Sequence, residues 1–209
     1  FDPVTVSVNV TTDNVPTTVS LKKVDAEKTH AQGDATLEGA TYGLYCDGNL
    51  LNSGTTDADG ELELGTFTPK KDSSYYVQEI SPSEGYLLSY NQYTIPVNED
   101  KDGNLSVKDI LITAEEQVIK GRISIIKHSD DGSTQIETPE VGAEFEVYLT
   151  SAGSYEDADP DERDTIVCDS HGFAQTKPLP YGTYTVHHTK ELSDIKSDSS
   201  FFRPLFIAI

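Results

Sequence analysis

Two lysines stand where the surrounding pattern calls for an apolar side chain. Lys23 ends the alternating segment 19–23, and Lys127 ends the alternating segment 123–127. Alternation with a period of two places one set of side chains on the face of a strand that packs into a core. A buried ammonium is costly unless a carboxylate pairs with it or it loses its proton, and a neutral amine is a nucleophile. The alternative is a fraying strand end, from which the lysine reaches water.

The two lysines belong to two copies of one internal repeat. The matched segments, first copy against second, are 19–25 with 123–130, 37–45 with 140–148, 56–60 with 168–172 and 74–79 with 183–188. The spacing between copies is that of a whole domain and not of a solenoid unit. Because the lysine recurs at the same place in both copies, the pattern favours burial over fraying.

Short alternating strands separated by turn residues carry both copies. Turn signals that contain glycine recur at 47–49, 57–60, 102–104, 131–132 and 170–172, and no segment has a capped helical stripe. The pattern predicts an all-β protein with two tandem immunoglobulin-like or prealbumin-like β-sandwich domains.

The expected domain boundaries follow from the repeat. The first sandwich is predicted at 16–117, and the second at 118–209, where it ends before its last strand. Residues 1–15 are predicted to be a strand of a preceding module or an added edge strand. The segment 117–121 is expected to be a short connector.

The charge excludes several classes of partner. The chain has 209 residues with 15 Lys and Arg against 36 Asp and Glu, which gives a net charge of −21. Such a field repels nucleic acids and anionic membranes, so neither is predicted as a partner. No apolar run is long enough to span a membrane, and no signal peptide or anchor is visible, so we expect a piece of a longer protein.

No cofactor or metal site is predicted. Cys46 and Cys168 lie in different copies, so we expect no disulfide between them, and the sequence leaves their role open. The acidic run 156–162 is interpreted as a solvated loop. A weak Ca²⁺ loop is the alternative, although the ligand spacing of an EF-hand is missing.

Four motifs of the first copy, at 19–25, 37–42, 56–60 and 76–86, resemble the collagen-adhesin B-type repeat, also described as the SpaA or pilin prealbumin-like domain. This family builds the stalks of surface adhesins and sortase-assembled pili of Gram-positive bacteria. The second copy resembles a divergent relative, which keeps the lysine strand and the segments 141–145 and 180–184.

The resemblance implies an isopeptide bond between a first-strand lysine and a last-strand Asn or Asp, assisted by a buried Glu. Lys23 matches the lysine and Glu79 matches the assisting Glu, but Glu116 stands where the family has Asn. The alternative is an ion pair of Lys23 with the two carboxylates. In the second copy, Lys127 matches the lysine and His188 stands where the Glu belongs, so we expect Lys127 to be unbonded.

The implied function is that of a structural stalk segment, extracellular and either cell-wall-anchored or secreted, and not an enzyme. Its expected partners are neighbouring modules of the same surface protein. The alternative is an adhesin module that binds a host matrix protein or glycan, which would show a sizeable exposed apolar or aromatic patch. Neither a pilin-polymerisation lysine motif nor a sorting signal is in the chain. Asn14 resembles the closing Asn of a preceding module.

Overall fold

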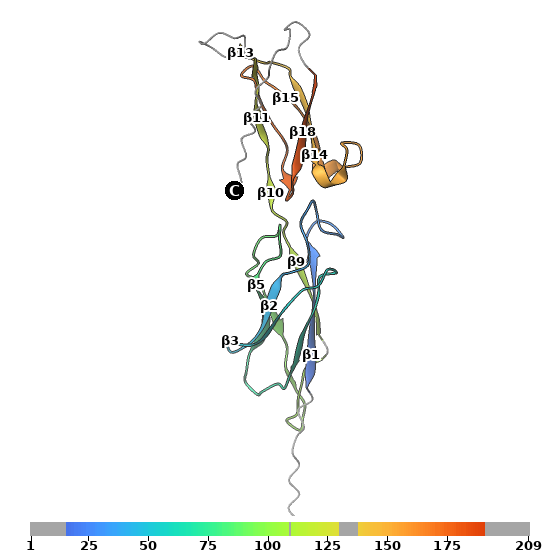
Figure 1. The fold of residues 1–209 in the computed structure, drawn as a ribbon. Coiled ribbons are helices and arrows are strands. Elements are labelled where there is room, and N and C mark those ends of the chain that lie inside the picture. Colours follow the sequence, from blue (N-terminus) through green and yellow to red (C-terminus); the bar gives the residue numbers. More distant parts are fainter. Residues whose placement is uncertain (1–15, 109, 130–137, 191–209) are drawn as a thin grey trace, which may run out of the picture. The chain divides into compact units, whose positions relative to one another are not determined.

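The computed structural model describes residues 16–108, 110–129 and 138–190, and strands dominate them (Figure 1). Helix in this part of the chain is limited to two short 3-10 turns, η1 (Thr150–Ala152) and η2 (Pro160–Glu162). Neither has the length and apolar character needed to cross a membrane. The all-β prediction is therefore confirmed. The predicted strand at 1–15, Asn14 and the region after β18 where a last strand was expected to be missing lie outside the described residues.

The chain forms two compact units, and each unit is built from several separate stretches of the sequence. Within the described residues, the first unit contains 16–24, 37–84 and 88–116, and the second contains 25–36, 85–87 and 117–190. The chain therefore leaves the first unit and returns to it twice before the second copy of the repeat begins. The division of the chain at residue 117 stays a prediction. Residues 25–36 and 85–87 precede that position but group with the second unit.

The first unit has two sheets. One has the order β4-β1-β9, with β1 Thr17–Asp25, β4 Glu61–Phe67 and β9 Ile110–Glu116. The other has the order β3-β2-β5-β6, with β2 Thr41–Cys46, β3 Asn49–Thr55, β5 Tyr75–Ser81 and β6 Gln92–Ile95, all antiparallel. A small hairpin, β7 Asn98–Glu99 with β8 Leu105–Ser106, precedes β9.

One hydrophobic core joins these two sheets into a sandwich. Val19 and Leu21 of β1 pack in the same cluster as Tyr42 and Leu44 of β2 and Val77 of β5, and each is at most 1 % exposed. Residues of β1 alternate strictly between buried and half-buried, as the sequence pattern predicts. The inward face of β1 therefore faces the second sheet, and Lys23 lies on that face.

The second unit holds a sheet of order β15-β14-β18, with β14 Glu144–Leu149, β15 Arg163–Val167 and β18 Tyr184–Lys190. Three short strand pairs complete it: β10 Lys120–Gly121 with β17 Leu179–Pro180, β11 Ser124–Ile126 with β16 Phe173–Gln175, and β12 His128–Ser129 with β13 Thr138–Pro139. Its core contains Ile125, Phe145, Val147 and Leu179. The expected connector is thus partly ordered structure, because Lys120 and Gly121 pair with β17.

In both units, an equivalent glycine turn accepts a hydrogen bond from the backbone of the buried lysine. The Lys23 N–H donates to the Gly60 carbonyl, and the Lys127 N–H donates to the Gly172 carbonyl, each at 2.8 Å. Both glycines have positive φ, 77° and 70°. A Cβ on Gly60 would lie 2.4 Å from the Lys23 carbonyl oxygen, so no other residue fits without a backbone shift. Glycine is required here by conformation and by space.

We expect Gly60→Ala to destabilise the first unit more than Gly48→Ala. Gly48 has a similar φ of 80° but nothing within 4 Å of an added Cβ. The stability lost in Gly48→Ala therefore reflects left-handed backbone strain alone, about 1–2 kcal/mol. The clash with the lysine carbonyl should add about 1–3 kcal/mol at Gly60. Urea unfolding of both variants measures the difference, and equal losses would show that the turn does not hold the lysine strand.

Candidate functional site

Lys23, Glu79 and Glu116 are brought together from three strands, one residue each from β1, β5 and β9. Their exposed fractions are 0 %, 5 % and 2 %. Glu79 continues the inward series of β5, and Glu116 ends the inward series of β9. The prediction that Lys23 points into the core is confirmed, and the two acids that the sequence named are buried with it.

Specific contacts position the charged groups of the site. The Lys23 Nζ lies 3.9 Å from Glu79 Oε1. The other oxygen of Glu79, Oε2, accepts a hydrogen bond of 2.7 Å from the Ser89 N–H. The Tyr42 hydroxyl donates to Glu116 Oε1 at 3.2 Å. Neutral donors therefore orient both carboxyls.

Burial changes the protonation of both acids. It raises the pKa of Glu79, against the opposing effects of the Ser89 N–H and the Lys23 charge. It also raises the pKa of Glu116, and the nearby Glu79 carboxylate raises it further. Burial, and then the Glu116 charge, raises the pKa of Tyr42, so its phenol stays a donor. Two carboxyls that share one lysine thus favour retaining a proton.

This arrangement is suited to two outcomes. A lysine and two carboxyls that hold a proton between them can remain a buried ion pair, whose net stabilisation is small but whose disruption is costly. Alternatively, a neutral amine can attack a protonated carboxyl and form an amide, with the second carboxyl moving protons. Both outcomes need the same exclusion of water.

In the second unit the lysine has a different acid. The Lys127 Nζ lies 3.5 Å from Glu140 Oε2, and Lys127 is 6 % exposed. His188 pairs in register with Phe145, as Glu79 does with Tyr42, so it does take the position of the acid, and its ring stacks on Phe145 at 4.7 Å.

Sequence reasoning missed Glu140, although a signal was available. In the repeat, Glu140 matches Leu37, so a charged residue replaces an apolar one at an equivalent position. The Glu140 N–H also donates to the Lys127 carbonyl at 3.0 Å, which fixes the two residues side by side. The expectation that Lys127 is unbonded stays a prediction.

The remaining candidate groups are two cysteines and the acidic run 156–162. Cys46 and Cys168 are free thiols in different units, and burial raises the pKa of Cys168. Across the described ranges, no three His, Cys, Asp or Glu side chains lie close enough to hold a metal ion. In the acidic run 156–162, Asp161 pairs with Lys28 and Glu162 accepts a hydrogen bond from Gly33. Those two carboxylates are bound to protein groups.

Residues 17–110 match the family model of the SpaA prealbumin-like fold domain. The match includes β1 with Lys23 and β5 with Glu79, and it ends before Glu116. The resemblance predicted from the sequence is therefore confirmed over these residues. No curated protein matches the chain.

The chain is similar to several solved structures. The chain is similar to the Bacillus anthracis TIE protein, with 22 % identity and a TM-score of 0.62 over 90 % of this chain, and it spans 31 % of that protein. It also matches a streptococcal ancillary pilin at 19 % identity, over 94 % of this chain and 60 % of the pilin, with a TM-score of 0.39. The shaft pilin SpaA of Lactobacillus rhamnosus GG, as its D295N mutant, matches at 16 % identity over 91 % and 94 % of the two chains, with a TM-score of 0.34. The likeness to the Bacillus protein supports the fold across most of the chain.

We expect Lys23→Met to cost far more stability than Lys22→Met. The two lysines are neighbours on opposite faces of β1, and Lys22 forms an exposed ion pair with Glu61 at 2.8 Å. Loss of that surface pair should cost little stability, because water and salt screen an exposed ion pair. Removing Lys23 leaves two buried acids without their cation and should cost about 3–5 kcal/mol at pH 7. Chemical denaturation compares them, and similar small losses would rule out a structural role for the buried lysine.

Proposed function

We propose that this chain is a structural segment of a bacterial cell-surface adhesin or pilus protein, built from two tandem prealbumin-like sandwich domains. The first domain is stapled by an amide between Lys23 and Glu116, which Glu79 assists. The segment is extracellular, its partners are neighbouring modules of the same surface protein, and it turns over no external substrate. The burial of one lysine with two acids from three strands supports this proposal.

The chemistry needs no cofactor. A proton passes from the Lys23 ammonium to a carboxylate, which leaves a neutral amine and a protonated acid. The Nζ lone pair attacks Cδ of the protonated Glu116, and Glu79 takes a proton from the nitrogen and returns it to the departing hydroxyl. One C–N bond forms, one C–O bond breaks, and one water leaves. The raised pKa of Glu116 favours the protonated form that the attack requires.

A staple at this place would have two mechanical consequences. It closes a loop of about 95 residues, which by loop entropy is worth about 4–5 kcal/mol. It also joins β1 to the end of β9, the last strand of the first unit. Tension entering at β1 would then pass through a covalent bond, and the sheet between these residues would not unzip.

We expect the intact protein to weigh about 18 Da less than its sequence, the mass of one water lost on amide formation. Peptide mapping should find residues 23 and 116 on one branched peptide. Glu79→Gln, which keeps the volume but cannot exchange the proton, should restore the full mass. Lys22→Met, on the opposite face of the same strand, should leave the deficit unchanged.

A full sequence mass in the wild-type protein would refute the staple and leave the ion pair. A mass deficit with a branch at Glu79 would reassign the partner. Either result leaves the structural role open to test, because that role rests on the family match and not on the amide.

A second function is favoured by one observation on the outer face of the β3-β2-β5-β6 sheet. Leu50 and Ile80 are 51 % and 43 % exposed. They meet over Gly43, where an added Cβ would lie 2.7 Å and 3.0 Å from their Cδ1 atoms. Tyr45 and Tyr76 stack beside them with ring centroids 5.0 Å apart. Such a patch suits a host matrix protein or glycan.

Binding to immobilised matrix proteins and glycans tests this second function. If the patch is a binding surface, Leu50→Asp should weaken saturable binding at least about tenfold, because it places a charge in an apolar contact. Leu111→Asp is the matched control, since Leu111 is 68 % exposed on β9 of the other sheet. Absence of saturable binding by the wild-type protein would discard the second function.

A further inference from the structure

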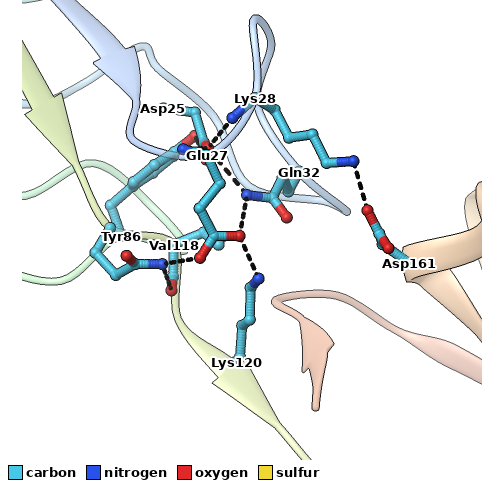
Figure 2. Close-up of polar contacts among 9 residues, drawn as sticks. Asp25, Glu27, Lys28, Gln32, Tyr86, Val118, Lys120 and Asp161 are labelled. Atoms are coloured by element: carbon cyan, nitrogen blue, oxygen red, sulfur yellow. Dashed lines mark hydrogen bonds and ion pairs between the residues drawn. The ribbon is translucent and has the colours of Figure 1, made fainter. Parts of the chain in front are cut away.

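Residues 25–36, which we call the strap, carry contacts that neither the repeat nor the family match explains. They connect β1 to β2 and fall inside the span that matches the SpaA domain model. They nevertheless pack within the second unit, together with residues 85–87 and the chain after 117. Figure 2 shows part of this packing around Glu27 and Asp25.

Asp34 joins the strap to the second copy through three hydrogen bonds. Its N–H donates to the Tyr181 carbonyl at 2.9 Å. Its Oδ1 accepts from the Ser151 hydroxyl at 2.7 Å, and its Oδ2 accepts from the Thr183 N–H at 2.9 Å. Next to it, the Gly33 N–H donates to Glu162 Oε1 at 2.7 Å. This surface therefore recognises one carboxylate and two backbone amides of the strap.

Three glycines allow the close approach. A Cβ on Gly33 would lie 2.2 Å from the Tyr181 carbonyl oxygen, and one on Gly182 would lie 3.0 Å from Asp34 Oδ2. A Cβ on Gly85 would lie 2.5 Å from the Ala35 Cβ. A side chain at Gly33 or Gly85 would push the strap away from the surface it contacts, because backbone atoms lie in the way.

The start of the strap is a buried polar cluster. Asp25, Gln32 and Tyr86 are 5 %, 3 % and 2 % exposed. The Gln32 amide donates to Asp25 Oδ1, and the Tyr86 hydroxyl donates to Asp25 Oδ2, each at 2.9 Å. Tyr86 also forms an isolated β-bridge with Val118, which follows the end of the first copy. A buried carboxylate with these donors is a specific contact, because each group would be costly to leave unsatisfied.

Two residues of the strap, Glu27 and Lys28, form ion pairs. The Glu27 carboxylate contacts the Lys120 ammonium and accepts a hydrogen bond of 2.8 Å from the Gln117 amide. These contacts lower the pKa of Glu27 to about 2. Lys28 pairs with Asp161 at 2.5 Å. Because the folded pKa of Glu27 lies below its ordinary value, its contribution is complete above about pH 4.5 and is lost as the pH falls toward 2.

We infer that the strap is a bound segment of the second unit, docked at a site formed by Ser151, Glu162, Tyr181 and Thr183. The occupant of that site is a loop of this same chain that carries Asp34 and is covalently continuous with β1. The second unit is therefore incomplete in any piece cut at residue 117, and its stability depends on the loop between β1 and β2. This inference does not depend on the staple.

Limited trypsin digestion of the full chain tests the docking, because Lys28 is a cleavage site within the strap. In Asp34→Ala the Ser151 and Thr183 contacts are lost, and we expect cleavage after Lys28 to be at least about tenfold faster than in the wild-type protein. Hydrogen exchange of the Gly33, Asp34 and Thr183 amides should accelerate in the same variant. Asp34→Asn, which keeps one acceptor oxygen, should fall between the two.

Asp169→Ala is the matched control. Asp169 also lies in the second unit and also accepts two backbone N–H hydrogen bonds, from His171 and Phe173, but it does not contact the strap. We expect it to leave cleavage after Lys28 unchanged. Docking would be overturned if Asp34→Ala left Lys28 as protected as in the wild-type protein, or if Asp169→Ala exposed Lys28 equally. Circular dichroism confirms that each variant retains its strand content.

Discussion

The strict inward alternation of β1 is the constraint on which the rest of the first unit depends. It buries Val19 and Leu21 between two sheets and then buries Lys23 as the next member of the same series. A cation in a core must be compensated, so the neighbouring strands supply Glu79 and Glu116. Those acids are buried in turn, which raises their pKa values. This buried cluster thus follows from ordinary sandwich packing in which three inward positions carry charged side chains.

The position of the strap relates it to the staple. The strap begins two residues after Lys23, and the proposed amide would close the chain from Lys23 to Glu116 into a loop that contains it. Tension passing from β1 through that bond would bypass the strap, whose contacts would then bear no load. A polar, acidic segment held by hydrogen bonds and ion pairs could remain docked on the second unit under tension that would otherwise pull it away.

The second unit shows how the same plan diverges. Lys127 keeps the inward position and the same glycine-turn hydrogen bond, but His188 has taken the place of the acid and stacks on Phe145. The charge of Lys127 is compensated instead by Glu140, which directly follows β13. A carboxylate thus lies beside the buried lysine in both units. The two units supply that carboxylate from different positions of the repeat.

The sequence by itself determined the all-β fold, the repeat, the inward direction of Lys23, and Glu79 and Glu116 as its neighbours. The fold, the repeat and the direction of Lys23 rest on period two and on turn residues, which are local properties of the chain, whereas the two acids follow from the family resemblance. Only the tertiary structure revealed that Glu140 faces Lys127 and that residues 25–36 belong to the second unit. Those contacts join residues far apart in the sequence, such as Asp34 with Thr183, through single hydrogen bonds and close glycine approaches. No periodic pattern records such pairings, because they depend on how finished elements pack.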